Sequence, residues 1–358
     1  MKNTIKITLI TLLSLITITG NVYAQSVHVV NNNAGTPGGS NVYGTIQAAV
    51  DAASDGDIIH IIPGSTTYER ADINKKVSLY GVGFNPDNET SVPARIDGLN
   101  FQSNSAGSSA MGLWFTGTVQ IHEGADQLVF SKNVFDDRVF TVNDDIVGGL
   151  IVLNNIWRSS VGTSTFALDI YDSGSVLISN NIFTRGSNST SYSSFIHANN
   201  NAVIRNNLFI NDTGGSPFKL DDAVVRNNIF YGNGITTSTN YGARNTVFTN
   251  NLLFAPANDQ FPIGEEGNTG SGNIEGQDPQ FVNLEQTRSA WDFAWNPDLE
   301  AGSPAIDAGS DGTDMGISGG SNPFDITGVP LPLIQLLDVP ALIGQDQNLD
   351  VTIRARGN

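Results

Sequence analysis

Residues 176–183 read Val-Leu-Ile-Ser-Asn-Asn-Ile-Phe, and five close variants of this stretch occur elsewhere in the chain. Successive copies are 21 to 26 residues apart, because the last Asn of each falls at Asn133, Asn155, Asn181, Asn207, Asn228 and Asn251. A constant core with a variable step is typical of stacked coils joined by loops of different length. A duplicated compact domain would not give this spacing.

The residue types within each copy indicate how the coils stack. Apolar and polar residues alternate over a few positions, which predicts a strand with one face in the core. An Asn tolerates the left-handed backbone of a tight bend, and its amide both donates and accepts hydrogen bonds. We therefore expect a ladder of Asn side chains between consecutive coils of a parallel β-helix, an all-β solenoid. Helical repeats would show a 3.6-residue period and enrichment in Ala or Leu, and neither is present.

An amphipathic helix is predicted to cap the first coil. Ile46, Ala49, Val50 and Ala53 have helical spacing within residues 45–53, and Gly56-Asp57 ends the segment. A cap is expected because an open solenoid end exposes apolar core and unpaired strand edge. The first strand is then expected to begin at Ile58.

The two ends of the chain differ from the repeat region. Residues 1–24 combine a basic start, an apolar run over 7–18 and small residues at 22 and 24, which predicts a cleaved secretory signal peptide. The organisation expected is a signal peptide over 1–24, a β-helix domain over 25–321 and a Pro/Leu-rich extended tail with a final strand over 322–358. The protein is then secreted and lies outside the cell, in the periplasm or on the outer surface.

Charge and cysteine content narrow the partners. The chain has 35 Asp and Glu against 17 Lys and Arg, a net charge of −18, and it contains no Cys. An acidic chain repels a phosphate backbone, so nucleic acid is not an expected partner. No later stretch is long and apolar enough for a membrane span. Without Cys, disulfides cannot support the fold. We also expect the protein to be a monomer.

Two sets of short motifs resemble those of a known superfamily. Residues 43–53, 56–59 and 63–64 look like the opening of pectate-lyase-like right-handed parallel β-helix proteins, and residues 278–282, 303–309 and 314–316 resemble their usual end. The resemblance implies a right-handed β-helix. It implies no single activity, because the group contains lyases, hydrolases, esterases and non-catalytic surface proteins.

Enzymes that resemble this chain act on polysaccharides at the outer face of one sheet, which points to the strands before the Asn motifs. Aligning residues 140–143, 168–171, 196–199 and 218–221 places their second and fourth residues outward. One outward column then contains Thr141, Asp169, His197 and Lys219. The other contains Asn143, Tyr171, Asn199 and Asp221.

An Asp, a His and a Lys in consecutive coils could supply acid–base chemistry. Lyase chemistry on a uronic acid needs a base, for which Lys219 or His197 is the candidate, with Asp169 beside them. Tyr171, Asn199 and Asp221 would contact the sugar. The alternative is an ordinary solvated face, since outward solenoid positions are polar in general and an Asp beside a Lys is a common surface ion pair.

Three arginines are candidates for binding substrate carboxylates. Arg205 and Arg226 each precede their Asn by two residues, in adjacent coils and on the sheet next to the columns, and Arg244 is the third. Two like charges so close together require a compensating anion. A nearby Asp or Glu from a loop would serve as well as an anionic glycan.

Other catalytic patterns are incomplete. The paired carboxylates Asp136-Asp137, Asp144-Asp145 and Asp221-Asp222 are the one part of a polygalacturonase-like set that is present, and the esterase-like Gln-Asp-Thr is absent. No metal or other cofactor is required by the sequence. A Ca²⁺ ion at Asp307, Asp311 and Asp314 is an open alternative to a structural role for that Gly-rich turn.

Two functions therefore remain. The first is a secreted carbohydrate-directed protein, with a polysaccharide lyase on an acidic glycan favoured over a glycoside hydrolase if it is an enzyme. The second is a non-catalytic solenoid that binds glycan or decorates the cell surface. An ice-binding solenoid is disfavoured because the outward columns are mixed rather than a regular array of Thr.

Overall fold

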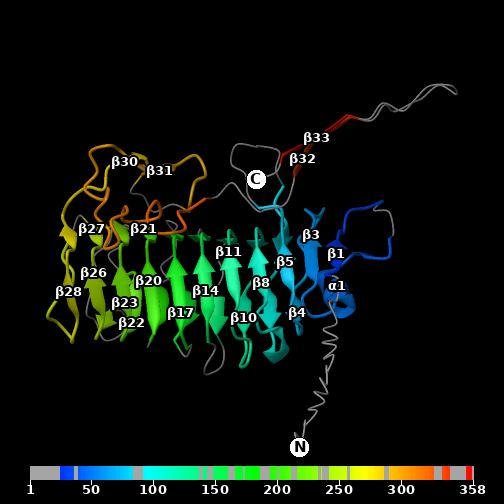
Figure 1. Ribbon diagram of the computed structural model, residues 1–358, viewed down its shortest axis with the longest axis horizontal. Coiled ribbons are helices and arrows are strands. Elements are labelled where there is room, and N and C mark those ends of the chain that lie inside the picture. The colour runs from blue at the N-terminus through cyan, green and yellow to red at the C-terminus, as the bar shows by residue number, and fades with distance from the viewer. Residues whose placement is uncertain are drawn as a thin grey trace, which may run out of the picture.

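The computed structural model describes residues 25–35, 39–83, 92–136, 140–142, 148–159, 166–171, 174–185, 194–199, 201–210, 216–232, 235, 242–255, 259–285, 290–325, 333–338 and 352–356. Within them the chain winds through three parallel sheets that form one long solenoid (Figure 1). The predicted parallel β-helix is confirmed. The predicted signal peptide and much of the predicted tail lie outside the described residues.

Sheet A has twelve strands and runs from the N-terminal to the C-terminal end of the solenoid (Figure 1). In spatial order its strands are β2 (Val42–Tyr43), β1 (Val27–Val30), β3 (Ile58–Ile61), β5 (Ser78–Tyr80), β8 (Ser109–Met111), β11 (Val129–Ser131), β14 (Leu150–Leu153), β17 (Val176–Ser179), β20 (Ala202–Arg205), β23 (Val224–Arg226), β26 (Val247–Thr249) and β28 (Thr269–Ser271).

Sheets B and C complete each coil. Sheet B contains β6 (Arg95–Ile96), β9 (Trp114–Phe115), β12 (Val134–Asp136), β15 (Ile156–Ser159), β18 (Ile182–Arg185), β21 (Leu208–Ile210), β24 (Ile229–Tyr231), β27 (Leu252–Phe254) and β29 (Ile274–Glu275). Sheet C contains β4 (Ala71–Ile73), β7 (Leu99–Phe101), β10 (Val119–Ile121), β13 (Phe140–Val142), β16 (Phe166–Ile170), β19 (Ser194–Ala198), β22 (Phe218–Asp221) and β25 (Ala243–Arg244).

The predicted Asn ladder lies at the turn from sheet A to sheet B. Each side-chain amide donates to the Asn carbonyl of the next coil, as in Asn181 Nδ2 to Asn207 Oδ1 at 3.0 Å. Each amide also donates to a main-chain carbonyl of the preceding coil, such as that of Val152 at 2.9 Å. Both contacts repeat along Asn133, Asn155, Asn181, Asn207, Asn228 and Asn251, and Asn273, the last of the series, donates to the Phe248 carbonyl.

The left-handed bend and the ladder are made by different residues. The residue before each ladder Asn has the positive φ, for example Asn180 at 54° and Asn206 at 53°. The first Asn of the pair therefore makes the bend and the second makes the ladder, whereas the sequence analysis predicted that one Asn does both. The seventh ladder residue, Asn273, was not predicted, because Gly272 (φ 69°) takes the place of the first Asn.

Stacked aromatic rings fill the core next to the ladder. Phe115, Phe135, Trp157, Phe183, Phe209 and Phe230 point inward from consecutive strands of sheet B. Neighbouring ring centroids are 4.5 to 5.0 Å apart, and their planes are nearly parallel. Aromatic stacking adds to the burial of apolar area, so this column stabilises the coils without disulfides.

The N-terminal cap is helix α1 (Ile46–Ala52), whose N-cap Thr45 accepts a hydrogen bond from the Ala48 amide. Ile46, Ala49 and Val50 are buried, as predicted. The prediction that Ile58 begins the first strand was wrong: β1 precedes the helix and pairs with β3. Its sequence, Val-His-Val-Val, is too short to show a strand period in isolation.

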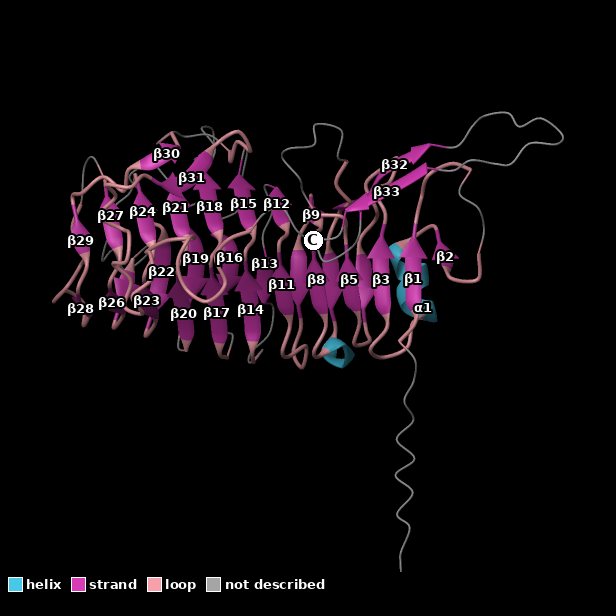
Figure 2. Cartoon of the chain, turned by 45° about the horizontal axis from the view of Figure 1, so that its top comes forward, coloured by secondary structure: helices cyan, strands magenta, loops and turns pink. Residues whose placement is uncertain are grey.

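Residues 290–325 lie across the outer face of sheet B. β30 (Phe281–Asn283) and β31 (Asn296–Leu299) form an antiparallel pair beside it (Figure 2), and Phe281 packs against Tyr231 of β24. Further along, Trp291, Met315 and Ile317 join an apolar cluster with the outward residues of sheet B.

The first Asn of consecutive coils binds the main chain of this covering segment. Asn180 donates to the Ile317 and Gly319 carbonyls, and Asn250 donates to the Ala308 carbonyl. The contacts of the covering segment extend to Asp325, which pairs with Lys132. Asp325 lies four residues beyond 321, the last residue of the expected β-helix domain. Beyond it, β32 (Leu333–Asp338) and β33 (Thr352–Arg356) form an antiparallel pair. No helix among the described residues is long and apolar enough to cross a membrane.

Candidate functional site

The outer faces of the three sheets differ in character. Sheet B is apolar and covered by residues 290–325, and sheet A is largely apolar. Sheet C is polar: register pairs join one outward residue from each of seven strands, namely Asp72, Asn100, Gln120, Thr141, Asp169, His197 and Lys219. The predicted alignment of Thr141, Asp169, His197 and Lys219 in consecutive coils is therefore present in the structure.

Asp169 and His197 form the closest contact in this column. His197 Nδ1 lies 2.9 Å from Asp169 Oδ1, across the pairing of β16 with β19. The His197 side chain is 12 % exposed. Its Nε2 is buried and has no hydrogen-bond partner among the described residues. A carboxylate that accepts from Nδ1 fixes the imidazole orientation and leaves Nε2 as the atom that can take up a proton.

Two aromatic rings enclose the imidazole, and a lysine lies over both. The ring centroids of Phe166 and Tyr171 are each 4.5 Å from that of His197, with interplanar angles of 27° and 24°. Lys219 Nζ lies 6.0 Å from the Phe166 centroid and 5.8 Å from that of Tyr171, within cation–π range. Tyr171 is 37 % exposed.

Phe166 was missed from the sequence. The strand Phe-Ala-Leu-Asp-Ile departs from strict alternation at its start, which is the one signal that an aromatic residue there could leave the core. The five residues Phe166, Asp169, Tyr171, His197 and Lys219 are called the sheet C cluster below.

The neighbouring coil carries an ion pair. Arg244 Nη2 lies 2.7 Å from Asp221 Oδ2, and Asn245 donates to the other carboxylate oxygen of Asp221. Two of the predicted substrate contacts are thus paired with each other, in a partly exposed position that a ligand carboxylate could enter. Asn199 follows β19, and its Oδ1 is buried without a hydrogen-bond partner among the described residues.

Arg205 and Arg226 lie on sheet A, in register with each other and away from the sheet C cluster. The pKa of the Asp311 carboxyl lies below its ordinary value. Burial alone would raise this pKa, but hydrogen bonds from Thr313 and the charge of Arg226 outweigh burial. The Asp311 carboxylate of the covering segment thus lies close enough to Arg226 to interact with its charge, and the anionic glycan stays the other predicted alternative.

Two carboxylates of the Gly-rich turn accept hydrogen bonds from residues of the same turn. Asp314 Oδ1 accepts from the Asp307 amide, and Asp311 Oδ1 accepts from the Thr313 amide and hydroxyl. No three His, Asp or Glu side chains in the described part of the chain are placed to hold a metal ion. Of the paired carboxylates, Asp137, Asp144 and Asp145 lie outside the described residues, as does Asn143.

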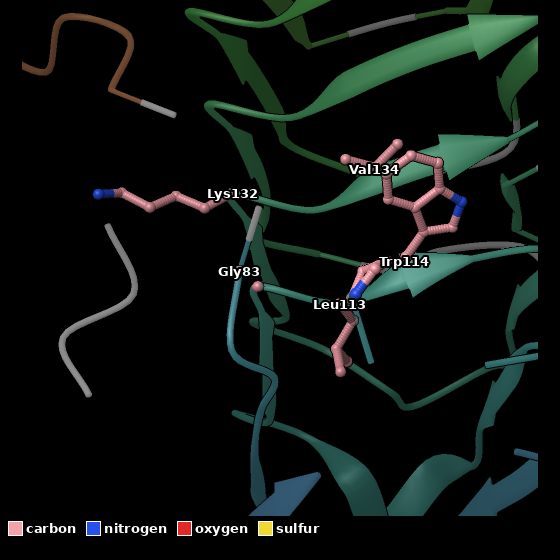
Figure 3. A pocket seen from close by; sticks show the side chains of 7 residues that line it. Gly83, Leu113, Trp114, Lys132 and Val134 are labelled. Atoms are coloured by element: carbon pink, nitrogen blue, oxygen red, sulfur yellow. The ribbon is translucent and has the colours of Figure 1, made fainter. Parts of the chain in front are cut away.

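A shallow depression near Trp114 is a second candidate (Figure 3). Its polar groups are already engaged. The guanidinium carbons of Arg95 and Arg158 each lie 5.4 Å from the Trp114 ring, and Trp114 Nε1 lies 3.3 Å from Asp136 Oδ2. Lys132, on its rim, pairs with Asp325 at 3.2 Å. This depression marks the edge of the covering segment, and the sheet C cluster is the better candidate.

No protein-family model matches the chain, and no curated protein matches its sequence. The chain's own geometry therefore carries the assignment of function.

Proposed function

We propose that the protein is secreted and acts on an acidic polysaccharide, which it binds along the outer face of sheet C and cleaves by β-elimination. The observation that carries this proposal is the stacking of Asp169, His197 and Lys219 in three consecutive coils. A proton acceptor with a fixed orientation and a cation beside it are the two groups that the reaction needs.

In the proposed reaction the bound polysaccharide must first uncover His197 Nε2, which is buried in the chain alone, and this atom then removes the proton from the carbon next to the uronate carboxyl group. The electron pair of that C–H bond forms a carbon–carbon double bond, and the glycosidic oxygen on the adjacent carbon leaves with a proton from solvent. Asp169 holds the imidazole through Nδ1 and stabilises its charged form. Lys219 stabilises the negative charge that develops on the carboxyl group.

Further features support an extended acidic ligand. Tyr171 offers a partly exposed ring to a sugar, and Arg244 can exchange Asp221 for a ligand carboxylate. The motifs at residues 43–64 and 278–316 favour membership of the pectate-lyase-like superfamily and a right-handed coil. Residues 1–24 favour export.

A second candidate is a non-catalytic glycan-binding solenoid of the cell surface. Burial of the His197 ring between two aromatic rings favours it, because a base must reach the substrate proton. In that case the sheet C cluster stabilises the coils and presents Tyr171 and Lys219 to a bound glycan.

The two candidates differ in product. The mature protein would be incubated with a panel of uronic-acid polysaccharides, with and without Ca²⁺, while the ultraviolet absorbance of the unsaturated uronate is followed. A rise with one polysaccharide supports the lyase. Retardation in a gel containing a polysaccharide, without any rise, supports the binding protein. If no polysaccharide of the panel gives a rise in absorbance or is retarded in the gel, both candidates are excluded for this panel.

A further inference from the structure

The outer face of sheet A carries an apolar stripe that the repeat pattern did not lead us to expect. Outward residues of six consecutive strands stand in register and touch their neighbours, since parallel strands lie about 4.8 Å apart. They are Val129, Ile151, Leu177, Val203, Val224 and Val247. These six residues are called the sheet A stripe. Both the inward and the outward residues of these strands are therefore apolar at this position, whereas a strand with one solvated face has polar residues on its outward side.

The sheet A stripe is not covered as the matching face of sheet B is. Val247 is 38 % exposed, and the other five residues of the stripe are partly exposed. The outward apolar residues of sheet B, such as Ile182 and Leu208, are fully buried under residues 290–325. One apolar face of the solenoid is thus sealed by the chain itself, and the other is open among the described residues.

The charge on this face is unusual for so acidic a protein. None of the twelve strands of sheet A, all of them described, contains an Asp or a Glu, although the chain carries a net charge of −18. Its outward basic side chains are Arg205, Arg226 and His60, and burial lowers the pKa of His60, which favours the neutral imidazole. Sheet C, by contrast, presents Asp72 and Asp169.

We infer that the outer face of sheet A binds the same face of a second copy of this chain. Two copies with a net charge of −18 repel each other wherever carboxylates meet, whereas the strands of sheet A contribute none and Asp311 of the covering segment, which interacts with Arg226, is offset by that arginine. The stripe has the same spacing in both copies, so its side chains interdigitate across a twofold axis as in a β-sandwich. An antiparallel arrangement of the long axes also keeps the arginine pairs of the two copies apart.

The size of the face predicts a weak dimer. The strands of sheet A extend over about 50 Å, and two outward columns give a width of about 10 Å. Each copy then contributes about 500 Å², and about 1,000 Å² in total is the lower limit of a specific interface. We therefore expect a dissociation constant in the micromolar range rather than an obligate dimer. This replaces the monomer expected from the sequence and is independent of the activity proposed for sheet C.

Sedimentation velocity over a dilution series of the mature protein tests the inference. The wild type is expected to change from dimer to monomer on dilution. Leu177→Glu with Val203→Glu, in adjacent coils of the stripe, is expected to weaken association by about tenfold or more. The matched control adds the same charge to adjacent coils of sheet C, Gln120→Glu with Thr141→Glu, and is expected to dimerise as the wild type does.

Circular dichroism and a thermal melt establish that each variant is folded. If the double Glu variant does not fold, Leu177→Thr with Val203→Thr, which keeps strand-forming residues, is expected to weaken association in the same direction. A wild type that stays monomeric at the highest concentration contradicts the inference, and so does a folded stripe variant that dimerises normally. A monomer that co-sediments with phosphatidylcholine–phosphatidylglycerol vesicles would show that the face binds lipid instead, which also overturns it.

Discussion

His197 Nδ1 lies 2.9 Å from Asp169 Oδ1, although 28 residues separate the two along the chain. The contact exists because β16 and β19 stack in register and both side chains point away from the core. A solenoid places residues of successive coils side by side at every such position. Few of those positions bring together a base, a carboxylate and a cation, which is why the sheet C cluster stands out from the rest of the polar face.

Asp169→Asn is expected to lower the rate of polysaccharide cleavage by about 100-fold or more, because the imidazole loses the carboxylate that orients it. Since Asp169 is about one-third exposed, the free energy of unfolding should fall by less than about 1 kcal/mol. Initial rates and a urea titration measure the two effects. An equal loss of rate in Thr141→Ala, one coil earlier, would show that the effect is not specific to the pair.

Asn181→Ala is expected to lower the free energy of unfolding by about 2 to 3 kcal/mol. The substitution removes the acceptor of the Asn155 amide and the donor to the Val152 carbonyl, and both groups are buried. Urea unfolding followed by near-ultraviolet circular dichroism of the aromatic stack measures the change.

Asn180→Gly is the matched control for the ladder. Gly adopts the positive φ of 54° without strain, so the variant keeps the ladder but loses the buried bonds from Asn180 to the covering segment and the bond that Ser179 Oγ donates to Asn180 Oδ1, and it should cost about 2 to 3 kcal/mol. Asn180→Ala should cost more than Asn180→Gly, because a Cβ is unfavourable at that φ. Equal losses in Asn180→Gly and Asn180→Ala would contradict the assignment of the left-handed bend to the first Asn of the pair.

Asp57 should make the N-terminal cap sensitive to acid. Burial raises the pKa of its carboxyl, but hydrogen bonds from the Ser54 and Ser26 amides and from His28 outweigh burial, and the pKa is lowered. A carboxyl with a lowered folded-state pKa stabilises the fold above its unfolded-state pKa and loses that effect as the pH falls through the folded-state value. We expect the hydrogen-exchange protection factors of β1 and α1, corrected for the pH dependence of intrinsic exchange, to fall below about pH 4.

Asp57→Asn should remove that acid response. The Asn side chain cannot ionise, so the protection factors in β1 should already be lower at pH 7 and should change little between pH 7 and pH 3. Asp55→Asn serves as the control: Asp55 lies at an exposed position two residues earlier, Asn can still accept the hydrogen bond from the Lys76 amide, and the variant should keep the wild-type pH profile. A steep acid response that persists in Asp57→Asn would assign it to another carboxyl group.

Ile317→Asp is expected to detach the covering segment from sheet B. Ile317 is 6 % exposed and packs in the apolar cluster, so a carboxylate there costs several kcal/mol. Dye binding to exposed apolar surface and limited proteolysis within 290–325 should both increase. Ile306→Asp adds the same charge to the same segment at a position that is 36 % exposed, and it should leave both measurements unchanged.

The repeated Asn-Asn stretch predicted the stacking, the ladder and the alignment of Asp169, His197 and Lys219, because a fixed corner residue sets the register of the strands before it. It did not predict which outer faces are covered. Val129 and Ile151 face outward with the same residue types that fill the core, and alternation alone cannot tell an outward aliphatic residue from an inward one. The covering of sheet B depends on contacts such as Asn180 with Ile317, which are more than 130 residues apart.

Phe166 and the Asp221–Arg244 pair show the same limit within the candidate site. The pair follows from the register of β22 and β25, which the sequence does not set because β25 has only two residues. Phe166 leaves the core at the start of β16, where the pattern of alternation gives no direction. Long-range packing, rather than local propensity, decides both positions.

The most direct test of the account compares Lys219→Ala with Gln120→Ala on the polysaccharide that the wild type cleaves or binds. Both residues belong to the outward column of sheet C, four strands apart, and only Lys219 lies in the sheet C cluster. We predict that Lys219→Ala loses cleavage, or binding if no unsaturated product forms, while Gln120→Ala keeps it and both variants melt as the wild type does. Unchanged activity in Lys219→Ala would contradict the placement of the site on this face.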